Sequence, residues 1–294
     1  MTNLAVFDLR AHRRHRARAA GRTGADFLFV EAAERLAGRL DDIRRRFPRA
    51  LDLGCRDGVM ARALQGRGGI EFLVAADAAL AFARLAPPPH LVAEAEALPF
   101  APNSFDLIVS NLALHWTNDL PGALLQLRHM LRPDGLLLAT LLGGETLGEL
   151  RRALMEAELA EEGGAGPRVS PFAELKDLGG LLQRAGFALP VVDGDVIEAT
   201  YPDALALMRE LRAMGESNAV AERRRAFTRR ATMARAAALY RALFAGPDGR
   251  IPARFELITL TAWAPDASQP KPAPRGSGTI SLADALGNTP SSPP

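Results

Sequence analysis

The chain has 294 residues, of which 48% are hydrophobic and 24% charged, a composition that excludes a mostly disordered protein. Its length allows one large domain or two small ones, and no apolar run approaches the roughly 18 residues of a transmembrane helix. The single cysteine, Cys55, excludes an internal disulfide and a cysteine-rich zinc site. We therefore expect a protein of a reducing compartment, the cytoplasm.

The first segment, residues 1–48, is basic and has helical periodicity. Residues 1–22 contain six Arg and one acid, Asp8, whereas the rest of the chain carries 30 basic and 33 acidic residues. Because the body is mildly acidic, the charge does not imply a nucleic-acid partner. The segment lacks the apolar stretch of a secretory signal. Two or three helices are expected over residues 7–47 from an apolar stripe of Phe27, Val30, Leu36, Leu40 and Ile43.

Residues 49–264 alternate between short apolar runs and helical patterns. The expected strands are Ala50–Leu53, Phe72–Ala76, Phe105–Ser110, Leu136–Leu142, Val191–Ile197 and Phe255–Trp263. Helices are expected at Val59–Leu64, Ala79–Leu85 and Leu120–Leu131. Such alternation is typical of an α/β fold, a doubly wound parallel sheet with helices on both faces.

Two later segments interrupt or follow this pattern. Residues 203–244 are rich in Met, Leu and Arg and predict a helical cap inserted before the last strand. Residues 265–294 contain seven of the 21 prolines and predict an extended tail. The domain prediction is thus a basic segment (1–48), an α/β domain (49–264) with its cap, and a tail.

A glycine-bearing turn follows the first expected strand, in the sequence Asp52-Leu53-Gly54-Cys55-Arg56-Asp57-Gly58. Glycine lets the backbone approach a ligand closely, and the next helix N-terminus favours an anionic group. Such turns also occur where nothing binds. Asp77, 25 residues after Asp52, ends the next strand, where an acid can accept both hydroxyls of a ribose. The pair predicts a site for a nucleoside-containing cofactor.

Three further segments make the sequence similar to a known family. They are Ala93–Phe100 (AEAEALPF), Asn103–Asn111 (NSFDLIVSN) and Arg132–Gly135 (RPDG). With these segments the chain resembles the class I S-adenosylmethionine-dependent methyltransferases. The resemblance implies a Rossmann-like, seven-stranded sheet and S-adenosyl-L-methionine as cofactor.

The same resemblance implies cofactor-binding roles for individual residues. Asp52 and Gly54 would lie near the amino-acid part of the cofactor, and Asp77 would hold the ribose. Glu94 and Ala95 would contact the adenine, Asn111 would lie near the methionine part, and Gly58 would belong to the same cofactor-binding set. Arg56 departs from the family, which usually has glycine there. Its side chain would either crowd the cofactor or fold outward to pair with Asp57 or the cofactor carboxylate.

The segment Ser110–Pro121 (SNLALHWTNDLP) narrows the resemblance. It is similar to the malonyl-carrier methyltransferases of biotin synthesis, and more similar to methyltransferase-fold assembly factors of respiratory complex I, which hydroxylate an arginine of an iron–sulfur subunit. The second resemblance extends into the cap at Met214–Asn218 and the tail at Arg275–Ser281. It implies a protein substrate, a complex I iron–sulfur subunit, and a bacterial cytoplasmic relative of these factors.

Four residues are candidates for the substrate pocket: His115, Trp116, Glu145 and Tyr201. His115 and Trp116 fit pocket lining as well as plain packing near a helix start. Glu145 either stabilises a helix N-terminus or binds a guanidinium in a bidentate pair. None of the five His belongs to a recognisable 2-His-1-carboxylate set, so no metal is predicted.

Three functions therefore remain open. The chain is an enzyme that modifies a protein side chain, a methyltransferase for a carrier protein or small molecule, or an assembly factor that binds the cofactor only for stability. A cap adds a second wall above the sheet edge and favours a bulky or peptidic substrate, although a packing role explains it equally well. The residues indicate a cofactor pocket, and only the resemblance introduces hydroxylation.

Overall fold

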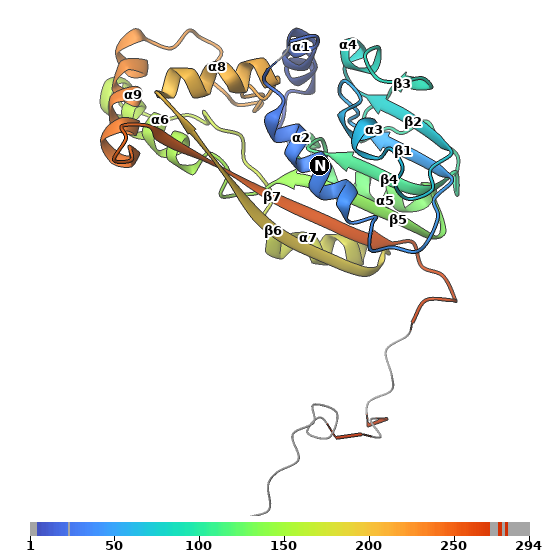
Figure 1. The fold of residues 1–294 in the computed structure, drawn as a ribbon. Helices are drawn as coiled ribbons and strands as arrows, with labels where there is room; N and C mark the ends of the chain where they lie inside the picture. The colour runs from blue at the N-terminus through green and yellow to red at the C-terminus, as the bar shows by residue number, and fades with distance from the viewer. Residues whose placement is uncertain (1–4, 23, 271–275, 278–279, 282–294) are drawn as a thin grey trace, which may run out of the picture.

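The computed structural model describes residues 5–22, 24–270, 276–277 and 280–281. A seven-stranded sheet with the order β3-β2-β1-β4-β5-β7-β6 runs through the molecule (Figure 1). The strands are β1 (Arg49–Leu53), β2 (Phe72–Asp77), β3 (His90–Val92), β4 (Phe105–Asn111), β5 (Leu131–Leu142), β6 (Ala188–Tyr201) and β7 (Ile251–Trp263). Sequence analysis missed β3, because a three-residue edge strand is too short to form an apolar run.

The sheet is mixed, so the prediction of a parallel sheet is wrong for one strand. Strands β1 to β5 pair in parallel, but β7 lies antiparallel to β5 on one side and β6 on the other. This direction follows from the connection between β6 and β7, which runs out through the cap and returns. Pairing is continuous along β5, from Leu136 opposite Trp263 to Leu142 opposite Leu257.

Two helical layers cover the sheet, because alternate residues of each strand point to opposite faces. Leu107 and Leu138 pack with the helices on one face, and Ile108 and Leu137 pack with those on the other. The first face carries α2 (Phe27–Gly38), α3 (Val59–Ala63) and α6 (Gly148–Glu162), and the second carries α5 (Leu120–Met130) and α7 (Leu175–Arg184). Helix α2, from the basic segment, is thus part of the main core.

Residues 203–244 contain two helices, α8 (Ala204–Met214) and α9 (Arg230–Phe244), between β6 and β7. Helix α8 begins where the Asp203 side chain accepts a hydrogen bond from the Ala206 amide, and it ends at Gly215 in the left-handed conformation. In Figure 1 both helices lie with α6 at one end of the long β6–β7 pair. We call α8, α9 and their connections the cap.

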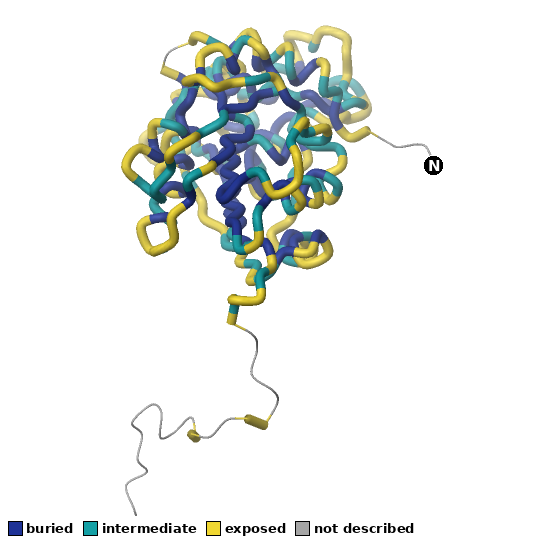
Figure 2. The backbone as a smooth tube through the Cα atoms, turned by 90° about the vertical axis from the view of Figure 1, so that its right-hand side faces the viewer, coloured by how far each residue is buried: buried dark blue, intermediate teal, exposed yellow. Residues whose placement is uncertain are grey.

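Helix α1 (Leu9–Ala19) lies beside the cap and the sheet, in contact with α8 and with α4 (Leu80–Ala83). Asp8 caps it by accepting a hydrogen bond from the Ala11 amide. Figure 2 shows the buried segments in the middle of the molecule, surrounded by exposed ones. In the part of the chain that the structure describes, no helix is long and apolar enough to cross a membrane. Most of the predicted tail lies outside that part.

Candidate functional site

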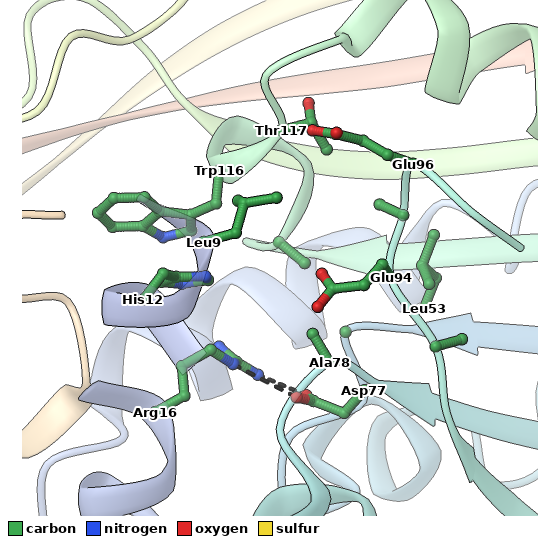
Figure 3. A pocket seen from close by; sticks show the side chains of 14 residues that line it. Leu9, His12, Arg16, Leu53, Asp77, Ala78, Glu94, Glu96, Trp116 and Thr117 are labelled. Carbon is green, nitrogen blue, oxygen red and sulfur yellow. Dashed lines mark hydrogen bonds and ion pairs between the residues drawn. The ribbon is translucent and has the colours of Figure 1, made fainter. Parts of the chain in front are cut away.

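An inner pocket lies at the carboxyl ends of β1, β2 and β4, where the strand order changes direction between β1 and β4. Open α/β sheets bind ligands at such a position, because the two neighbouring crossovers leave on opposite faces. Fourteen residues from the strand ends, the following loops and α1 line the pocket: Leu9, His12, Arg16, Leu53, Gly54, Asp77, Ala78, Ala93, Glu94, Ala95, Glu96, Ala113, Trp116 and Thr117 (Figure 3). Its volume of about 50 Å³ holds a few water molecules.

The loop after β1 has the backbone that its glycines predict. Gly54 has φ +81°, and a Cβ on it would lie 2.2 Å from the Cβ of Ala113. The amides of Gly54 and Cys55 donate to the Ala76 carbonyl at the end of β2, at 2.7 and 3.0 Å. Position 54 therefore accepts only glycine. Gly58, at the start of α3, lies against Pro87 and does not line the pocket.

Arg56 also has a left-handed backbone, with φ 53°, at the position where the resembled family usually has glycine. Its guanidinium points away from the inner pocket, stacks on the Phe29 ring at 3.7 Å and donates Nη1 to the Met214 carbonyl at 2.7 Å. Burial lowers the pKa of Arg56 to about 10. The side chain ties the first loop to the end of α8, and it is not paired with Asp57, whose carboxylate pairs with Arg62.

Asp52 lies within β1, fully buried, and neither carboxylate oxygen has a hydrogen-bond partner among the described residues. Burial, with the nearby charges of Asp77 and Asp57, raises its pKa to about 8. A buried carboxyl without a donor is costly, and such groups mark places where a ligand or water completes the site. Asp52 is the unsatisfied acid next to the inner pocket.

Asp77 and Glu94, the other two predicted cofactor acids, line the pocket and are both held by arginines of α1. Arg16 Nη2 lies 2.5 Å from Asp77 Oδ2 in a buried ion pair, and Arg13 Nη1 lies 2.5 Å from Glu94 Oε1 (Figure 3 shows the first). Asp77 also accepts the amides of Arg56 and Ala79, at 3.0 and 2.8 Å. Helix α1 thus closes the pocket with its own cations.

Asn111, at the end of β4, is buried and does not line the pocket. Its Nδ2 donates to the Phe29 carbonyl and its Oδ1 accepts from Thr140 Oγ1, both at 2.9 Å. Ala95 lines the pocket next to Glu94. The structure therefore brings Gly54, Asp77, Glu94 and Ala95 together at the pocket, with Asp52 behind them, whereas Asn111 ties α2 to the sheet.

The four predicted substrate-pocket residues do not form one group. His115 and Trp116 lie in a short 3₁₀ helix, η1 (Leu114–Trp116), at the pocket edge. Glu145 is exposed and does not line the inner pocket, and its amide donates to Glu256 Oε2. Tyr201 is buried at the end of β6, where burial, with the nearby Glu210, raises its pKa.

Trp116 is the centre of a buried polar cluster that sequence analysis missed. The indole stacks on His12 of α1 at 4.4 Å, and its Nε1 donates to Glu216 Oε2 at 2.8 Å. His115 Nε2 lies 3.7 Å from the same oxygen. Burial alone would raise the pKa of Glu216, but the close approach of His115, with the charge of Arg16, lowers it to about 2.

These partners come from segments far apart in the sequence, so no local sequence pattern predicts their contact. The only signal was the Met214–Asn218 motif, which contains Glu216. Burial and the charge of Arg16 lower the pKa of His12 to about 3, so its ring is neutral. Within the described ranges no group of three His, Cys, Asp or Glu could hold a metal ion.

An outer chamber of about 730 Å³ lies between the cap, α6 and the end of α1. Its apolar lining includes Leu142, Leu150, Leu154, Phe172, Met208 and Phe255, and its cationic lining is Arg18, Arg22, Arg168, Arg212, Arg223 and Arg224. Glu216 is the acidic residue of this lining. Trp116 lines both the chamber and the inner pocket, so the two cavities are separated by its side chain.

Comparison with known proteins agrees with this geometry. Residues 51–139 match the family model described as a methyltransferase domain. The chain is 42% identical over 264 residues to "Arginine-hydroxylase NDUFAF5, mitochondrial" of Danio rerio, covering 88% of this chain and 82% of that protein. It is 39% identical to "Malonyl-[acyl-carrier protein] O-methyltransferase" of Halorhodospira halophila, covering 79% of this chain and 80% of that protein.

Among solved structures, a putative methyltransferase from Bacillus halodurans is similar in fold. Its TM-score is 0.55 at 15% identity, over 80% of this chain and all of that one. At that identity the likeness concerns the fold alone. The match confirms the methyltransferase-like architecture expected from the sequence.

Proposed function

This chain belongs to the methyltransferase family that includes the NDUFAF5 arginine hydroxylases and the malonyl-carrier methyltransferases, and from that premise we propose that it is an S-adenosylmethionine-dependent enzyme acting on a protein side chain. In this proposal the inner pocket binds the cofactor, the outer chamber receives the substrate group, and the activity serves respiratory complex I assembly. The proposed place of action is the bacterial cytoplasm.

The residues of the inner pocket suit this cofactor. The unpartnered Asp52 carboxyl supplies an acceptor for an ammonium group, which also removes the penalty of its isolation. The missing side chain at Gly54 leaves the backbone accessible. Asp77 and Glu94 supply acceptors for ribose hydroxyls and an exocyclic amine. When bound, S-adenosylmethionine supplies an electrophilic methyl group on a sulfonium.

The pocket must open before it binds a molecule of this size. Its volume of about 50 Å³ compares with about 300–1,000 Å³ for small-molecule sites. Arg16 and Arg13 occupy the acids that the cofactor requires, so binding exchanges two ion pairs for cofactor contacts. Movement of α1, which carries both arginines, removes both obstacles together.

The observation that carries the proposal is the contact between the two cavities at Trp116. A group transferred from the inner pocket to the outer chamber passes this residue. In such a transfer, most of the rate enhancement comes from positioning the two reactants. Glu216 and His12 fix the indole from two sides. The size and apolar interior of the chamber suit a side chain delivered by a protein.

A second candidate is methylation of a carboxylate on a carrier protein. The specific observation in its favour is the arginine-rich chamber lining, since guanidinium groups bind carboxylates in paired hydrogen bonds. Similarity to the malonyl-carrier enzyme of Halorhodospira halophila supports it as well. A cofactor-binding assembly factor without catalysis is the third possibility.

Mass spectrometry of complex I subunits from a strain that lacks this gene tests the proposal. An arginine that loses an addition of about 16 Da supports hydroxylation, and a residue that loses about 14 Da supports methylation. Unchanged subunits together with loss of carrier methylation would favour the second candidate. Purified protein that fails to bind S-adenosylmethionine, with Asp77→Ala indistinguishable from wild type, would refute the cofactor assignment.

A further inference from the structure

Helix α1 carries a row of arginines on the side opposite the inner pocket. Arg10, Arg14 and Arg18 recur every fourth residue, which places them within an arc of about 80° on the helix. All three are exposed, as is Arg22 just after the helix. Leu9, His12 and Arg16 occupy the other side and line the inner pocket. We call Arg10, Arg14, Arg18 and Arg22 the arginine stripe.

The stripe differs from the other arginines of the same segment in having no acidic partner. Arg13 and Arg16 form ion pairs with Glu94 and Asp77. Among the described residues, no carboxylate lies within ion-pair distance of any arginine of the stripe. Within the stripe, Arg22 Nε donates a hydrogen bond to the Arg18 carbonyl. Four like charges in a row repel one another unless a partner neutralises them.

The stripe leads to the mouth of the outer chamber. Arg18 and Arg22 line the chamber, and Arg212 of α8, also exposed and without an ion-pair partner among the described residues, lines it from the cap. The other three arginines of the lining are neutralised: Arg168 by Glu158, Arg223 by Asp8 and Arg224 by Glu162. Among the arginines of the chamber lining, those without an ion-pair partner in the described residues are therefore Arg18, Arg22 and Arg212, two of which belong to the stripe.

We infer that the arginine stripe, with Arg212, is a docking surface for an acidic segment of the protein that delivers the substrate group to the outer chamber. The role of the docked protein rests on the proposed function, whereas the binding itself does not. Carboxylates of the partner would pair with the exposed guanidinium groups and orient the approach. The apolar interior would then receive the side chain next to that segment.

Charge complementarity and the side chains beside the stripe favour an acidic protein over a nucleic acid. Single-stranded nucleic acids bind grooves in which aromatic side chains stack on the bases. Helix α1 offers no exposed aromatic ring beside the stripe, because His12 is buried on the other side of the helix and His15 is half-buried. The stripe is a row of charges beside a chamber whose lining is partly apolar and partly cationic.

The test measures binding of a fluorescein-labelled 16-residue peptide of alternating Glu and Ala to the full chain at low salt. The stripe variant is Arg10→Gln/Arg14→Gln/Arg18→Gln, in which glutamine retains helix propensity. The control, Arg44→Gln/Arg49→Gln/Arg184→Gln, removes three exposed arginines that also lack ion-pair partners among the described residues. Both variants lose the same net charge, and neither alters the inner pocket.

We expect the stripe variant to bind the peptide about tenfold more weakly than wild type, and the control within about twofold. Added salt should reduce the difference, because these charges are exposed. If both variants bind the peptide equally more weakly than wild type, net charge alone explains the effect and the inference is overturned. Tighter, stripe-dependent binding of a single-stranded RNA of equal charge would overturn it in favour of a nucleic acid. Since no cofactor or activity enters the assay, its failure is distinct from failure of the proposed function.

Discussion

We expect the ion pair between Arg16 and Asp77 to control access of the cofactor to the inner pocket. Both side chains are almost completely buried, with Arg16 Nη2 2.5 Å from Asp77 Oδ2. Arg16→Met keeps most of the side-chain volume and removes the charge. Loss of one partner of a buried pair costs about 3–5 kcal/mol of folding free energy, because the remaining charge stays buried. At about 2 °C for each kcal/mol, the melting temperature without ligand should fall by about 6–10 °C.

Cofactor binding should change in the opposite direction. In wild type, the ribose must displace Arg16 from Asp77, whereas in the variant this carboxylate is available. Recovery of about 2 kcal/mol of the displacement cost would tighten binding of S-adenosylmethionine roughly 30-fold. Isothermal titration calorimetry measures this, and thermal unfolding with the ligand should show a larger stabilisation than in wild type.

Arg168→Met is the matched control. Arg168 is also largely buried and paired with a carboxylate, Glu158, but it lies in the outer chamber. It should lower the melting temperature and leave the cofactor dissociation constant unchanged. If Arg16→Met binds the cofactor as wild type does, or more weakly, Arg16 does not obstruct the site and the reasoning is refuted.

Three further substitutions test the pocket and its cluster. Gly54→Ala places a Cβ 2.2 Å from its neighbour and should abolish cofactor binding in calorimetry, whereas Gly21→Ala, at a similar φ with open space, should not. Because the pKa of Asp52 is about 8, the folded protein keeps a proton above pH 4 that the unfolded chain releases. The free energy of unfolding therefore falls as pH rises from 4 to 8. Asp52→Asn should remove this decline of up to about 5 kcal/mol, measured by urea unfolding. The Glu216 carboxylate, whose pKa is about 2 beside His115, stabilises the fold at pH values above its ordinary pKa, and this stabilisation is lost as pH falls towards 2. Glu216→Gln should therefore lower the free energy of unfolding by about 2–3 kcal/mol at pH 7 and by little near pH 2. An equal loss at both pH values would contradict the assignment.

Sequence patterns predicted the positions of Asp52 and Asp77 because each lies at the end of an apolar strand, and parallel strands end at one edge of a sheet. The position of Glu94 came from the family resemblance, because the short strand before it, β3, was missed. The patterns did not predict that arginines of α1 hold two of these acids. Arg16 and Asp77 are 61 residues apart, and no periodicity connects them. The pairing depends on how α1 lies over the sheet, which only tertiary packing decides.

The direction of β7 and the role of Glu216 were beyond sequence reasoning for similar reasons. An apolar run of residues 255–263 reads the same in a parallel or an antiparallel strand, because side-chain alternation has no direction. Glu216 follows a helix end and would ordinarily be solvated. Its burial comes from α1 and η1, which bring His12 and Trp116 against it.

The position of Cys55 gives the molecule an intrinsic reporter of motion. It is the single cysteine of the chain, fully buried in the loop after β1 among Ala75 and Ala86, and burial raises the pKa of its thiol. An alkylating reagent therefore reaches it only when that loop separates from its neighbours. The rate of thiol modification in the native protein therefore measures how often this loop opens, and no label has to be introduced.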